Sequence, residues 1–114
     1  GGIVDLRKAV SLTKGQTETV SMLAYALARS GQRTEALTLL DTVKSRYAAT
    51  GAGAYNVARI YLALDDKENT LAWLEKDLAD HSSWITQLFI DEVFDPVRNE
   101  PRVQAIFRAT GQIR

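Results

Sequence analysis

The chain has 114 residues, 46% of them hydrophobic and 25% charged, a composition typical of one folded domain and unlike that of a disordered chain. Fourteen basic residues balance fourteen acidic ones, so the net charge creates no field that would attract nucleic acid or an anionic membrane. Cysteine is absent, which excludes disulfides and thiolate metal sites, and no stretch approaches the ~20 consecutive apolar residues of a membrane-spanning helix.

Apolar residues recur at helical spacing through the first half of the chain. The spacing predicts helices over residues 3–12, 17–30 and 34–48. Gly15 and Gly31 end the first two, because glycine readily adopts the left-handed conformation that closes a last turn. The break between the second and third helices is short, so these two should pack as an antiparallel pair. The side chains expected to point inward from this pair are Val20, Leu23, Ala24, Leu27, Ala36, Leu37, Leu40, Val43 and Tyr47.

The same arrangement then repeats. A fourth helix is predicted over residues 54–64, and a fifth ends near Asp80. Asp65 and Asp66 cap the fifth helix, with Glu68 three residues after Asp65 as in a capping box. The inward side chains expected here are Val57, Ala58, Tyr61, Leu71, Leu74 and Leu78.

The last thirty residues differ in pattern. Apolar residues between Trp84 and Phe94 suggest another helix, and Asp95-Pro96 and Glu100-Pro101 each resemble an acidic helix start with proline at the first helical position. The final helix is then expected over residues 101–110. Large apolar side chains are placed to cover the last helix pair, namely Trp84, Phe89, Phe94, Val97 and Phe107. No strand signal is present, so the predicted fold class is all-α.

Laying residues 17–50 over residues 51–84 aligns the two helix pairs, with Ala24 on Ala58 and Gly31 on Asp65. This pattern resembles the tetratricopeptide repeat (TPR), a family with a period of about 34 residues. The resemblance implies a right-handed superhelical solenoid of antiparallel helix pairs with a C-terminal helical cap. The second repeat departs from the family pattern at Asp65, Thr70 and Asp77.

The same resemblance divides the chain. It implies the second helix of a truncated repeat in residues 1–15, helix-pair repeats in 16–50 and 51–84, and a cap in 85–114. The segment 94–102 is similar to the closing segment of many bacterial repeat arrays. We therefore expect the C-terminal end of an array within a larger bacterial signalling or regulatory protein.

In the TPR fold the first helix of each pair lines a concave surface where ligands usually lie. The resemblance therefore implies a non-catalytic interaction module that binds a peptide or protein segment through Glu18, Met22, Tyr25, Arg29, Tyr55, Asn56 and Arg59. Two phenol rings, an amide and a guanidinium suit a peptide backbone with a carboxylate. Asn56 matches a position of the chaperone-tail carboxylate clamp of some members, but the other clamp positions lack the required cations, so chaperone-tail binding is not expected; they hold Ser21, Tyr25, Thr86 and Ile90.

The alternative is a structural spacer or self-association module without its own ligand. An apolar edge near the N-terminus favours it, because such an edge can join two copies end to end; its residues are Ile3, Val4, Leu6 and Val10. Trp73 is expected to pack on the preceding pair, or else to be a partly exposed contact residue for a partner.

No residue set predicts catalysis, a metal or a cofactor. His81 is the single histidine, and its neighbours Asp80 and Ser82 are contiguous with it, so they cannot converge as a catalytic triad. The carboxylates Asp91, Glu92 and Asp95 do not match the spacing of a calcium-binding loop and are expected to be solvated or to cap helices.

Overall fold

The computed structural model describes residues 2–113, so Gly1 and Arg114, the outermost residues of the two terminal segments predicted above, lie outside it. The described residues are helical and contain no strand, which confirms the all-α class. The elements are α1 (Gly2–Leu12), α2 (Thr17–Arg29), α3 (Arg33–Thr50), α4 (Ala54–Ala63), α5 (Lys67–Ala79), the 3-10 helices η1 (Ser83–Gln87) and η2 (Glu92–Val97), and α6 (Pro101–Ala109).

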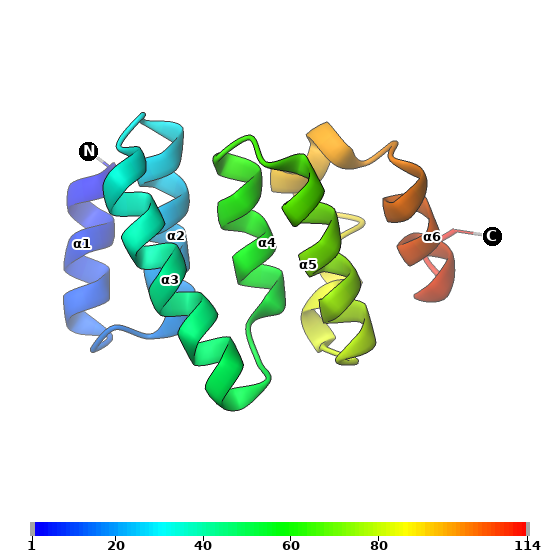
Figure 1. Ribbon diagram of the computed structural model, residues 1–114, viewed down its shortest axis with the longest axis horizontal. Helices are drawn as coiled ribbons and strands as arrows, with labels where there is room; N and C mark the ends of the chain where they lie inside the picture. The colour runs from blue at the N-terminus through cyan, green and yellow to red at the C-terminus, as the bar shows by residue number, and fades with distance from the viewer. Residues whose placement is uncertain (1, 114) are drawn as a thin grey trace.

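Helices α1 to α5 form a row, each antiparallel to the one before it, in which α2 packs against α1, α3 and α4 (Figure 1). The molecule is elongated along this row, with principal extents of 42 × 28 × 20 Å. We call η1, η2 and the turn between them the tail. In the view of Figure 1 the tail lies behind α4 and α5, and α2 lies behind α3, so α2 and the tail share one side of the row. Within residues 2–113, no helix combines the length and the apolar character needed to cross a bilayer.

The turns after α2 and α4 have the same hydrogen bonds. After α2, the N–H of Gly31 donates to Ala28 (3.2 Å) and the N–H of Gln32 to Leu27 (2.8 Å). After α4, the N–H of Asp65 donates to Leu62 and that of Asp66 to Tyr61, both at 3.0 Å. Gly31 and Asp65 have left-handed φ values of +87° and +62°. Both turns are Schellman motifs, 34 positions apart in the sequence, and Asp65 holds a conformation that glycine adopts with less strain.

Replacing Asp65 by glycine should therefore stabilise the protein by about 0.5–1 kcal/mol, because the gain in the left-handed turn exceeds the added freedom of the unfolded chain. Urea denaturation of the two forms measures the change. The adjacent Asp66→Ala is the control with opposite sign. Asp66 caps α5 by accepting the N–H of Asn69 (3.2 Å), and its loss should destabilise by about 1 kcal/mol. A loss of stability in Asp65→Gly would contradict this account of the turn.

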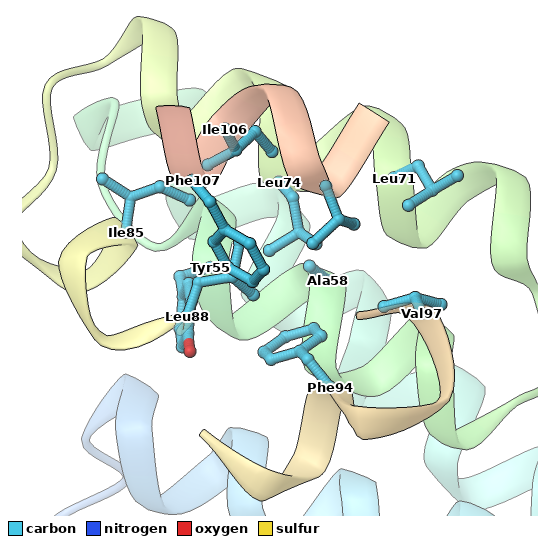
Figure 2. Close-up of a cluster of buried hydrophobic side chains, with 11 residues drawn as sticks. Tyr55, Ala58, Leu71, Leu74, Ile85, Leu88, Phe94, Val97, Ile106 and Phe107 are labelled. Carbon is cyan, nitrogen blue, oxygen red and sulfur yellow. The ribbon is translucent and has the colours of Figure 1, made fainter. Parts of the chain in front are cut away.

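Two hydrophobic clusters lie along the row, with α4 contributing to both. Val57 and Ile60 face the first cluster, with α2 and α3, and Tyr55 and Ala58 face the second, with α5, α6 and the tail (Figure 2). Most predicted inward residues are buried there. Leu37 was predicted to point inward and this is wrong, since 40% of it is exposed. The buried stripe of α3 runs through Ala36, Leu40 and Val43, and Leu37 lies about 100° around the helix from Ala36.

The predicted helix between Trp84 and Phe94 is also wrong, because two short 3-10 helices form instead. Ser82 accepts the N–H of Trp84 (3.0 Å), and Asp91 accepts that of Val93 (3.1 Å). Short polar side chains that bond nearby N–H groups in this way restart the chain rather than continue a helix. Pro96 lies inside η2 and starts no helix, whereas Pro101 opens α6 as predicted.

Three of the five predicted covering residues, Phe94, Val97 and Phe107, are buried as expected. Trp84 is partly buried, and Phe89 is exposed although its ring meets Phe107 edge to face at 5.1 Å.

Trp73 and the N-terminal helix α1 both pack against neighbouring helices. Trp73 packs on the preceding pair as predicted, its ring centroid 5.0 Å from that of Tyr47. In the predicted N-terminal edge, Ile3, Leu6 and Val10 are partly buried against the first cluster, and Val4 is exposed.

Candidate interaction groove

An apolar depression runs along α2, on the side of the row that α2 shares with the tail. We call it the apolar groove; its volume is about 410 Å³. It is lined by Leu6 of α1, by Glu18, Ser21, Met22, Tyr25 and Ala26 of α2, by Arg59 of α4 and by Val93 of the tail. Met22 is 46% exposed, which is high for a large apolar side chain on a helix with a buried opposite face. Four of the seven predicted partner-binding residues, Glu18, Met22, Tyr25 and Arg59, therefore meet here.

The α4 part of the predicted surface is not open. Tyr55 is fully buried in the second cluster and Asn56 is only 5% exposed, so the expectation that both lie free on a groove is wrong. The physical reason is the tail, whose Trp84 stacks on the Tyr55 ring at 5.9 Å and whose Phe94 meets it edge to face at 5.2 Å. Figure 2 shows Tyr55 among Leu88, Phe94 and Phe107. Arg29, the remaining predicted residue, is exposed at the end of α2 and does not line the groove.

Arg59, the cation of this face, is already paired with a carboxylate of the chain itself, that of Asp91. The hydroxyl of Tyr55 donates to Asp91 Oδ2 (2.7 Å), and Arg59 Nη2 donates to the same oxygen (3.0 Å). The Arg59 guanidinium also lies over two rings, with Cζ 5.0 Å from the Tyr55 centroid and 5.5 Å from that of Trp84. Tyr55 and Arg59 were predicted to bind a partner's carboxylate, and in this structure they bind the carboxylate of Asp91 instead.

The pKa values in this cluster follow from these contacts. Burial acts to raise the pKa of Asp91, but the hydrogen bonds from Tyr55, Arg59 and the Val93 N–H outweigh it and hold that pKa below its usual value. Burial, reinforced by the bond to Asp91, raises the pKa of the Tyr55 hydroxyl. Asp91 is thus ionised and Tyr55 neutral at pH 7, which is the pairing that the hydrogen bonds require.

A second depression of about 330 Å³, the polar pocket, adjoins the first, and Glu18 lines both. Its other lining residues are Thr17, Arg46, Thr50, Ala52, Gly53, Asn56 and Trp84. Asn56 Oδ1 is buried and accepts no hydrogen bond from the described residues. Arg46 is held by its Nη1, which donates to the carbonyl of Gly15 (2.6 Å) and to Thr17 Oγ1 (3.1 Å).

Asp77 beneath α4 was not assigned a role from the sequence. It is 1% exposed, and its Oδ2 has no hydrogen-bond partner among the described residues. The backbone N–H of Tyr55 and the Ser82 side chain act to lower its pKa, against the effect of burial. Gly53, the N-cap of α4, has no side chain to bond the first N–H groups of that helix, and Asp77 of α5 is the carboxylate near the Tyr55 N–H. Burial is the main cause that raises the pKa of Asp77, to about 6.

The described residues include no cluster of three or more His, Cys, Asp or Glu side chains that could hold a metal ion. His81 is exposed in the turn after α5, where its φ is +55°. It lies in a Schellman turn, since its N–H donates to Leu78 (3.0 Å) and that of Ser82 donates to Asp77 (3.3 Å).

No protein-family model, no curated protein and no solved structure matches the chain. The TPR resemblance therefore depends on the residues and turns described above. What the groove can bind has to follow from its own side chains.

Proposed function

We propose that the chain is a non-catalytic protein-interaction module built of TPR-like helix pairs, part of a larger bacterial signalling or regulatory protein, which binds a peptide or protein segment along α2. Gly31 and Asp65, 34 positions apart, hold the left-handed position in the turns that join the two helices of each pair, which supports the repeat assignment. Ala24 and Ala58, both fully buried at equivalent positions, also support it. A small side chain at these points lets the neighbouring helices approach closely.

The apolar groove is the single observation that carries the binding proposal. Its volume falls within the range of ligand sites, and its lining is mainly apolar with a few polar groups that could orient a ligand. Met22 and Tyr25 provide apolar contact area, and neither belongs to the buried set of either cluster. Exposed Glu18 and Arg29 stand at the two ends of the same helical stripe without an ion pair among the described residues.

A random-peptide display selection on the purified chain tests this proposal. Peptides enriched on the native chain should bind Met22→Asp at least about tenfold more weakly, because a carboxylate in the groove removes apolar contact and must be desolvated. Leu37→Asp is the matched control, since Leu37 is 40% exposed on α3 and Met22 is 46% exposed on α2. Equal binding to all three forms would place any selected peptide outside the groove and remove the support for this function.

One observation favours the structural alternative. The tail covers Tyr55 and pairs with Arg59 of α4, so part of the surface expected for a ligand serves intramolecular packing. Val4 and Leu12 are exposed on α1 and offer a contact for a second copy. A chain that enriches no peptide and sediments as an oligomer would support this spacer or self-association role instead.

A further inference from the structure

We propose that the occupant of the groove is an extended peptide segment with a basic side chain two positions from a large aliphatic one. The basic group binds between Glu18 and Asn56, and the aliphatic group binds beside Met22 and Tyr25. This inference rests on the proposed function and names the chemistry of its ligand.

Two acceptors without donors define the basic subsite. Glu18 lines both depressions, and its carboxylate forms no ion pair among the described residues. Asn56 lines the polar pocket and is only 5% exposed, and its buried Oδ1 accepts no hydrogen bond from the described residues. A buried acceptor left unsatisfied is unfavourable, and native structures rarely keep one without a partner. An ammonium or guanidinium group supplies the donors that the Glu18 carboxylate lacks and neutralises its charge.

An acidic ligand is less well served. Two cations of the described chain line the depressions, Arg46 and Arg59. Asp91 neutralises Arg59 at 3.0 Å. Arg46 donates to the Gly15 carbonyl and to Thr17, which fixes it against the α1–α2 turn. A carboxylate entering beside Glu18 would therefore meet like charge.

The spacing of the ligand follows from α2. Glu18 and Met22 are one helical turn apart, about 6 Å along the axis. In an extended peptide, successive side chains point to opposite faces, so side chains on one face are two residues and ~6.6–6.8 Å apart. A basic and an aliphatic residue separated by one position therefore reach the two subsites together. Leu6 and Val93 close the sides of the apolar subsite.

Short capped peptides in a Gly/Ser background test the inference by fluorescence anisotropy. Two peptides carry Lys and Leu two positions apart, one in each order. Each has two control peptides, called its twins: the Glu/Leu twin has Glu in place of Lys, and the other has Ser in place of Leu. We expect a Lys/Leu peptide to bind at least about tenfold more tightly than either twin. Glu18→Gln should weaken it about fivefold, and Glu18→Lys should reverse the preference toward the Glu/Leu twin.

The matched controls are Asp41→Asn and Asp41→Lys, because Asp41 is an exposed carboxylate on α3, away from both depressions. They should leave binding unchanged. Asn56→Leu keeps the volume and removes the acceptor, and it should weaken the Lys/Leu peptide. If that variant does not fold, the Glu18 variants decide, since Glu18 is exposed and its substitution leaves the core intact.

The outcomes separate this inference from the proposed function. Binding of the Glu/Leu twin that Met22→Asp abolishes would overturn the basic ligand and keep the groove. Failure of every peptide, in the panel and in the display selection, would overturn both. The exposed residues Val4, Lys8 and Leu12 on α1 offer similar chemistry within the chain. Self-association that Lys8→Glu and Glu18→Lys each abolish would assign the groove to a second copy and overturn the peptide partner.

Discussion

Replacing Asp77 by asparagine should raise the free energy of unfolding at pH 7 by about 1–3 kcal/mol, because a neutral group of similar size replaces a buried carboxylate. Asp77 is 1% exposed, and no cation pairs with it among the described residues. The rise of its pKa from 3.8 to about 6 corresponds to about 3 kcal/mol of cost for the ionised form. Asparagine has a similar size and carries no charge, so most of that cost disappears.

The sign of the pH dependence follows from the same shift. Between the unfolded pKa of 3.8 and the folded pKa of about 6, the folded state binds more protons at Asp77 than the unfolded state. This residue therefore lowers the stability as the pH rises from 4 to 6, and its contribution is constant above the folded pKa. In Asp77→Asn the contribution is absent, so the two forms should have similar stability near pH 4 and diverge up to about pH 6.

Urea denaturation of both forms across this pH range measures the difference directly. Subtracting the two profiles removes the opposing effect of Glu35, Glu75 and Asp91, whose pKa values are lowered and which cost stability below their unfolded values. Asp41→Asn, at an exposed site, should follow the native profile. Parallel profiles for the native chain and Asp77→Asn would show that Asp77 ionises normally in the folded state.

The sequence predicted the features that local signals determine. Helices α1 to α5 and the start of α6 follow from apolar spacing, from Gly15 and Gly31, and from Pro101. In α3, apolar spacing alone does not determine which residues at the edge of the stripe are buried. Leu37 and Ala36 are adjacent apolar residues at the edge of one stripe, and only the position of the neighbouring helices decides which of them is buried.

The candidate site was predicted in part for the same reason. Glu18, Met22 and Tyr25 lie on the face of α2 opposite its buried stripe, and that is a property of one helix. Tyr55 and Asn56 occupy the corresponding face of α4, but the tail returns across it. The bond between Arg59 and Asp91 joins residues 32 positions apart, and no local pattern announces such a contact. The sequence therefore could not predict that Asp91 pairs with Arg59 rather than being solvated.

Replacing Phe94 by alanine should destabilise the protein by about 3–5 kcal/mol, because Phe94 is one of the largest fully buried side chains and the substitution leaves a cavity in the second cluster. Phe89→Ala is the matched control from the same tail. Its ring also meets an aromatic partner, Phe107 at 5.1 Å, but it is exposed, so the loss should stay near 1 kcal/mol. Urea denaturation followed by circular dichroism gives both values.

Phe94→Ala also tests whether the tail is what keeps Arg59 from other ligands. A loosened tail releases Asp91, and Arg59 with the Tyr55 hydroxyl then becomes a free site for a carboxylate. At a temperature where Phe94→Ala is still folded, the acidic Glu/Leu peptide should gain affinity for it relative to the native chain, and Phe89→Ala should show no such gain. A loss of only about 1 kcal/mol in both variants, without any gain for the acidic peptide, would mean that the tail contributes little to the core and does not occupy Arg59 in solution.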